Sequence, residues 1–211
     1  MKSLVLSSIL LFLLPPWGIT PLYTINQHRY VDLGLPSGLL WADRNVGANI
    51  PAQSGDYFSW GEIDKRPLGL YRGKTRLKKI PEYSGDTIYD VARVQWGAEW
   101  RTPTENELQE LIDLCKWEWT ERNGSKGYTV TGPNGASIFI PMGGISTSDG
   151  IFDALSLYWS STPSTSSYSA ACMIINPDKD EYPISIREHP RKNGGMVRPV
   201  HNPIRNKQKI Y

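Results

Sequence analysis

The sequence predicts one α+β domain in which antiparallel strands and hairpins are flanked by two helices. Three observations lead to this prediction. Several apolar stretches alternate with a period of two and are separated by turn sequences, which is typical of antiparallel strands. Two other segments repeat their apolar residues at helical spacing. The chain has 211 residues without an internal repeat or a low-complexity tract, and this length suits a single domain with its own core.

The first residues are predicted to direct export. Lys2 precedes an apolar run at residues 4–14, which ends at two prolines. This run is shorter than the roughly 20 residues that a membrane-spanning helix needs, so it indicates a secretory signal peptide over residues 1–22. Cleavage is expected between Gly18 and Thr24. We therefore expect a periplasmic, cell-surface or secreted protein without a transmembrane anchor.

The signal peptide precedes a domain over residues 23–201 and a basic tail over residues 202–211. A lipid anchor would need a cysteine directly after the apolar run, and none is present there. The formal net charge is only +2, so composition gives no indication of a nucleic-acid partner.

The N-terminal part of the domain is expected to be rich in hairpins and loops. A Pro-Ser-Gly turn divides two apolar runs within residues 30–42, which predicts a hairpin. Residues 57–61 are aromatic and predict a short strand. Residues 62–85 are expected to form an inserted loop whose basic side chains are most simply solvated. These basic residues are Lys65, Arg66, Arg72, Lys74, Arg76, Lys78 and Lys79.

Two helices are expected in the middle of the chain. The first is predicted over residues 87–96, where apolar residues recur at helical spacing. The second begins at Thr104, since Thr104 and Glu107 have the spacing of a capping box. One apolar stripe then faces the core. It consists of Leu108, Leu111, Ile112 and Cys115.

From residue 117 the period of the pattern changes from helical to two. Trp117 and Trp119 alternate with polar residues before an Asn-Gly turn at 123–124. A second hairpin is expected from strands at 128–131 and 137–140, and a polar loop is expected over 143–153. The remaining predicted strands cover 157–161, 168–175, 182–187 and 196–200.

Cys115 and Cys172 leave two alternatives open. In an exported protein the two cysteines could form a disulfide. They equally fit two separate buried thiols, because Cys115 continues a helical stripe and Cys172 lies in an apolar strand. A reactive thiol has no support from a nearby histidine or a C-x-x-C motif.

Several phrases in fixed order give the chain a resemblance to a known family. They are YVDLGLPSGL at 30–39, NVGA at 45–48, WGE at 60–62, WRTPT at 100–104, SIFIP at 137–141, YWSS at 158–161 and VRPV at 197–200. The chain resembles the FISUMP-type secreted proteins of Bacteroidetes-like bacteria, a branch of the C-type lectin-like superfamily. The resemblance implies a single C-type lectin-like domain with paired N- and C-terminal strands, two flanking helices and a loop-rich face. It also implies that Trp100, Trp159 and Arg198 are framework residues.

The resemblance places ligand contacts in variable loops rather than in the conserved phrases. These loops are residues 144–154, 162–168, 176–182 and 188–195. Tyrosine with small polar residues is typical of binding loops. The candidate contacts are Asp149, Asp153, Tyr168, Arg187, His189 and Arg191. For each of them, a surface-charge or framework role is the competing interpretation.

No metal or cofactor is expected. The calcium-dependent sugar motifs of the superfamily are missing, and Asn176-Pro177-Asp178 is more simply a β-turn. The three histidines are scattered, and neither cysteine lies in a motif like that of the superfamily's paired-cysteine oxidases.

The predicted function is therefore a non-catalytic extracellular or cell-surface binding domain, which recognises a glycan or a protein surface without calcium. One alternative is a structural subunit of a surface or appendage assembly, in which case an envelope assembly would be its partner. A minor alternative is an enzyme of unknown type.

Overall fold

The computed structural model describes residues 24–65, 80–179 and 183–203. The predicted signal peptide, most of the tail and every basic residue of the inserted loop except Lys65 lie outside these residues. No helix in the described ranges is both long and apolar enough to cross a membrane.

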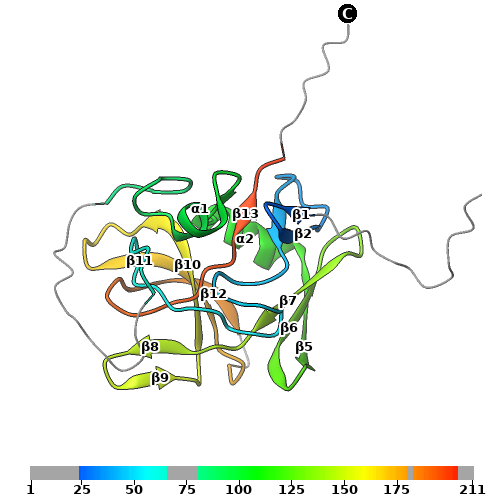
Figure 1. Ribbon diagram of the computed structural model, residues 1–211. Helices are drawn as coiled ribbons and strands as arrows, with labels where there is room; N and C mark the ends of the chain where they lie inside the picture. Colours follow the sequence, from blue (N-terminus) through cyan, green and yellow to red (C-terminus); the bar gives the residue numbers. More distant parts are fainter. Residues whose placement is uncertain (1–23, 66–79, 180–182, 204–211) are drawn as a thin grey trace, which may run out of the picture.

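The described chain is mostly antiparallel sheet with two helices, so the predicted α+β class is confirmed (Figure 1). The helices are α1 (Val91–Trp96) and α2 (Glu105–Leu114). The strands are β1 (Thr24–Ile25), β2 (His28–Asp32), β3 (Leu40–Ala42), β4 (Trp100–Arg101), β5 (Lys116–Arg122), β6 (Ser125–Thr131), β7 (Ser137–Pro141), β8 (Ile145–Thr147), β9 (Gly150–Phe152), β10 (Ser156–Pro163), β11 (Ser169–Ile175), β12 (Ile184–Pro190) and β13 (Val200–His201).

The strands form four separate sheets. A five-stranded sheet has the order β1-β2-β3-β13-β4, and two three-stranded sheets have the orders β5-β6-β7 and β10-β11-β12. The hairpin β8-β9 lies at the opposite end of the molecule from β1, β2 and β13 (Figure 1).

The last strand lies between strands from earlier in the chain. Val200 of β13 is opposite both Trp41 of β3 and Arg101 of β4. The expected pairing of N- and C-terminal strands is therefore confirmed, as is the hairpin between β2 and β3. Trp100 and Trp159 are fully buried, in agreement with a framework role.

Helix α2 begins as predicted. The Thr104 hydroxyl accepts a hydrogen bond from the Glu107 amide, and the Glu107 carboxylate accepts one from the Thr104 amide at 2.8 Å. Both terminal nitrogens of Arg101 donate hydrogen bonds to the same carboxylate, at 2.7 and 2.6 Å. Burial alone would raise the pKa of Glu107, but the hydrogen bonds and charge of Arg101, with those of Thr104, outweigh it, so the pKa is lowered.

Helix α1 is shorter than predicted because a buried aspartate fixes its start. Asp90 caps the helix by accepting a hydrogen bond from the Ala92 amide, and it also accepts from the amide and hydroxyl of Thr102. These bonds hold residue 90 in an extended conformation, so the helix begins at Val91. Ile88, which the helical pattern included, is 63% exposed.

Three predicted segments have different structures from those expected. Of the strand predicted at 196–200, only Val200 lies in a strand, and Met196 forms an isolated bridge to Tyr158. Residues 57–61 form no strand; they contribute a single bridge, Phe58 to Gly195, because the facing segment 191–195 is itself irregular. The expected polar loop at 143–153 contains the hairpin β8-β9. Its turn is closed by Thr147, whose hydroxyl donates to the Gly150 carbonyl at 3.0 Å.

The two cysteines do not form a disulfide. Cys115 packs in the cluster around Leu108 and Leu111, whereas Cys172 packs in a second cluster with Trp159, and both are free thiols. The disulfide alternative is therefore wrong and the alternative of two buried thiols is correct. Burial, with a smaller contribution from Glu110, raises the pKa of Cys115 to about 11.

Arg198 is the most deeply buried cationic side chain among the described residues, with 1% of its surface exposed. Its Nε donates to Asn45 Oδ1 at 2.8 Å. The two terminal nitrogens donate to the carbonyls of Ala42 at 3.0 Å and Phe139 at 2.9 Å. A single side chain thus connects three segments that lie far apart in the sequence.

Replacing Arg198 with lysine should destabilise the fold strongly. An ammonium group cannot reproduce the planar fork that reaches three acceptors in different directions, so buried acceptors lose their partners. We expect the free energy of unfolding to fall by about 3 kcal/mol. Urea denaturation of Arg198→Lys measures this loss, with Arg187→Lys on an exposed part of β12 as the matched control. Equal stability of the two variants would contradict the role given to Arg198.

Candidate functional site

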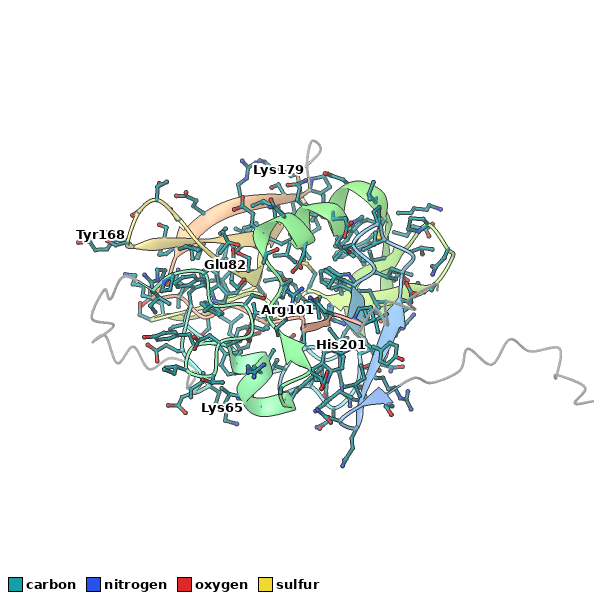
Figure 2. The ribbon with its side chains drawn as sticks, turned by 90° about the horizontal axis from the view of Figure 1, so that it is seen from above. Lys65, Glu82, Arg101, Tyr168, Lys179 and His201 are labelled. Carbon is teal, nitrogen blue, oxygen red and sulfur yellow. The ribbon has the colours of Figure 1, made fainter. Side chains whose placement is uncertain are left out.

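The six predicted contact residues do not form one face. Asp153 lies just before β10, at the same end of the β10-β11-β12 sheet as the turn after β11. Tyr168 lies just before β11, at the other end, where His189 pairs with Ala170; Arg187 pairs with the middle of β11. The seven residues of β11 separate the two ends by about 20 Å. Figure 2 accordingly shows Tyr168 and Lys179 at different edges of the molecule.

Arg191 is part of the framework. It is only 4% exposed, and its guanidinium lies 4.2 Å from the ring centre of Trp60. Its Nη1 donates to the Ser167 carbonyl at 3.1 Å, and its backbone bonds to Trp60 and Tyr168. Of the two interpretations of Arg191, the framework role is therefore favoured over a ligand contact, because cation–π packing and backbone bonding bury it.

His189 is also packed against the protein. Its ring tilts against Trp159, with ring centres 6.2 Å apart, and its Nε2 lies 2.9 Å from Asn193 Nδ2. Residues 188–190, which were predicted as part of a loop, belong to β12. Burial lowers the pKa of His189, so the ring is neutral at neutral pH.

Three further candidates, Arg187, Tyr168 and Asp149, are exposed. Arg187 and Glu188 line a shallow depression of about 400 Å³ with Glu105. Tyr168 is 66% exposed and points into solvent (Figure 2). Asp149 is at the tip of β8-β9, where its carboxylate accepts a hydrogen bond from Ser148. None of these residues is brought together with Asp153.

Asp153 instead lines a groove of about 520 Å³, which we call the Trp119 groove. Three stretches that are remote in sequence build it: the β5-β6 hairpin with the residue after β7, the segment between β9 and β10, and the turn after β11. Its lining residues are Trp119, Lys126, Tyr128, Met142, Asp153, Ala154, Pro177 and Asp178.

The register of the β5-β6-β7 sheet explains how the aromatic wall forms. Trp117 and Trp119 point to the same face because side chains alternate along a strand. Trp117 pairs with Val130 and packs against the core, whereas Trp119 pairs with Tyr128 nearer the hairpin tip. Trp119 contacts Tyr128 edge-on, with ring centres 5.0 Å apart, and remains 48% exposed.

The opposite side of the groove carries two carboxylates. The turn at 176–179, closed by a bond from the Lys179 amide to the Asn176 carbonyl at 3.2 Å, places Asp178 there. The predicted β-turn is thus confirmed. Asp153 supplies the second carboxylate, and both side chains are exposed.

One cation also lines the groove. Lys126 brings one positive charge, against the two carboxylates of Asp153 and Asp178. The two aspartates therefore leave the groove with an acidic character.

Sequence reasoning identified Asp153 but missed the rest of the groove. The exposure of Trp119 could have been predicted from the sequence. Two tryptophans alternate just before a hairpin turn, and the one nearer the turn is exposed when the strand extends beyond the layer that covers it. Asp178 had none, because its position beside Trp119 depends on how two sheets pack.

The described residues contain no cluster of three or more histidine, cysteine, aspartate or glutamate side chains that could hold a metal ion. No family model, curated protein or solved structure with which the chain was compared matches it significantly.

The packed state of His189 predicts a pH dependence of stability. Because its pKa is lowered in the folded protein, the unfolded chain takes up a proton first as the pH falls through 6.5, and the free energy of unfolding decreases. Urea denaturation above and below this pH should show a smaller decrease for His189→Gln. Some decrease should remain, since burial and Arg44 also lower the pKa of His28. An unchanged pH dependence in the variant would contradict the packed, neutral state of His189.

Proposed function

We propose that the protein is a non-catalytic binding domain that holds a neutral glycan in the Trp119 groove. One observation carries the proposal: a half-exposed tryptophan faces a groove whose other side presents two carboxylates. The resemblance to FISUMP-type proteins and the predicted signal peptide support an extracellular location for this binding.

The exposure of Trp119 distinguishes it from the other described tryptophans. Trp41, Trp60, Trp96, Trp100 and Trp159 are all buried, and Trp117 is partly buried. Leaving such a ring in water forgoes the favourable free energy of burying its apolar surface. A sugar ring can recover this free energy, because its axial C–H groups form an apolar face that stacks on an indole.

The polar residues complement the hydroxyl groups of a sugar. Ionised Asp153 and Asp178 only accept hydrogen bonds, so they suit hydroxyl donors, and Lys126 can donate to a hydroxyl or ring oxygen. An apolar wall with a few convergent polar groups is the usual composition of a small-molecule site.

The charges favour a neutral glycan over an acidic one. A uronate or sulfated sugar in the groove would bring its own negative charge close to Asp153 and Asp178, and this repulsion is a common source of specificity. Lys126 can offset only one of these two negative charges.

Removing the aromatic wall should abolish most of the binding. We expect Trp119→Ala to weaken binding of a neutral oligosaccharide by at least about tenfold, because the stacking surface is lost. Calorimetric titration against oligomers of glucose, galactose, mannose and xylose measures the change. Tyr168→Ala, which removes another exposed aromatic ring at the other end of the sheet, is the control. Loss of binding in the control but not in Trp119→Ala would move the site to the Tyr168 loop.

The same titrations test the non-catalytic part of the proposal. The oligosaccharides should be recovered intact after long incubation with the protein. Release of new reducing ends that depends on Asp153 or Asp178 would instead show a glycoside hydrolase.

Neutralising the carboxylates should change the charge preference. In the double variant Asp153→Asn, Asp178→Asn, binding of galacturonate oligomers should strengthen, since the repulsion is removed while the amide oxygens still accept hydrogen bonds. Binding of neutral oligomers should change much less. The unmodified protein should bind galacturonate better at high salt, where charges are screened. An unchanged preference for neutral over acidic oligomers in the double variant would show that the aspartates do not set it.

A further inference from the structure

The chain contains three Asn-Gly pairs, at 123–124, 134–135 and 193–194. This pair is the most reactive dipeptide toward intramolecular deamidation, because glycine has no Cβ to hinder the approach of its backbone nitrogen to the preceding side chain. The reaction needs two free groups: the asparagine carboxamide and the backbone N–H of the glycine. The three pairs differ in whether the fold leaves these groups free.

At the second pair both groups are held. Asn134 donates from Nδ2 to the Asp32 carbonyl at 2.9 Å and accepts from the Ala136 amide at Oδ1 at 3.0 Å. The Gly135 amide donates to the Gly132 carbonyl at 2.9 Å. The carboxamide also lies against Gly34, so it has little room to turn.

At the third pair both groups are held by different partners. Asn193 Nδ2 lies 2.9 Å from His189 Nε2. The Gly194 amide donates to the Ser146 carbonyl at 2.7 Å, in a bridge that connects two segments. Reaction at this site would require the bridge to open first.

At the first pair the fold holds neither group. Asn123 and Gly124 are exposed at the tip of the β5-β6 hairpin. Within the described ranges, no hydrogen bond involves the Asn123 carboxamide or the Gly124 amide. A Cβ at Gly124 would meet no atom within 4 Å, so the tip also has space to rearrange.

We propose that Asn123 is the site of spontaneous deamidation in the folded protein. The Gly124 nitrogen attacks the side-chain carbonyl carbon of Asn123 and forms a new C–N bond. The carboxamide nitrogen leaves as ammonia, taking up the proton that the Gly124 nitrogen loses, and a five-membered succinimide remains. Water then opens this ring at either carbonyl, which gives aspartate or isoaspartate at position 123.

The two products have different consequences for the hairpin. Aspartate preserves the turn, since Asp-Gly is also a preferred sequence for a two-residue hairpin turn with positive φ, and φ is 50° at Asn123 and 76° at Gly124. Isoaspartate routes the backbone through one additional carbon, which misaligns the Arg122–Ser125 pair that closes the hairpin. Both products add a negative charge at neutral pH.

Ageing of the intact protein at mildly alkaline pH tests the inference. Peptide mass spectrometry should show the mass increase from NH₂ to OH at residue 123, at a rate at least about tenfold higher than at residues 134 and 193, because those sites must first break hydrogen bonds. In urea, where the fold is lost, the three sites should react at similar rates. Asn123→Gln, whose longer side chain would have to close a less favourable six-membered ring, should remove the fast reaction.

Two results would contradict deamidation at Asn123 in the folded protein. Equal rates at the three sites in the folded protein would overturn the inference. So would a residue 123 that reacts in urea but stays intact in the folded protein over the same time, since the fold would then protect it.

Discussion

The buried guanidinium of Arg198 is the interaction on which the arrangement of the sheets depends. Its three hydrogen bonds reach Ala42 at the end of β3, Asn45 in the following loop and Phe139 in β7. The five-stranded sheet, which contains β3, and the β5-β6-β7 sheet are thereby fixed relative to each other. No carboxylate in the described residues forms an ion pair with it. The cost of burying its positive charge is therefore offset mostly by hydrogen bonds to neutral oxygens, with a longer-range contribution from Asp43. A buried charge satisfied in this way tolerates little displacement, because each lost bond leaves a desolvated group unpaired.

This constraint determines where the Trp119 groove forms. With β7 fixed by Arg198, β6 and β5 extend outward from it in register, and the core covers Val130 and Tyr128 of β6 but leaves Trp119 of β5 half-exposed. The uncovered surface faces the start of β10 and the turn after β11. The groove is thus the place where one sheet projects beyond the layer that packs on it.

Local features were predictable from the sequence, whereas features that depend on sheet packing were not. The capping box at Thr104 and the hairpins at 123–124 and 133–135 depend on neighbouring residues alone, and the structure confirms them. The start of α1 was misplaced because Asp90 is held partly by Thr102, twelve positions later. Arg191 was included among the candidate contacts because its packing on Trp60, from a distant segment, leaves no trace in sequence. For the same reason Asp153 was identified but its neighbours in the groove were not.

The position of β13 between β3 and β4 has a consequence for engineering. The first and last described strands, β1 and β13, belong to one sheet, and they lie at the end of the molecule opposite to the hairpin β8-β9, beside which Asp153 enters the groove (Figure 1). A fluorescent protein or a surface tether joined at either end would therefore sit away from the groove. Several copies of the domain joined through these ends could then each present one Trp119 groove to a repetitive polymer, with the gain in avidity that multivalency provides.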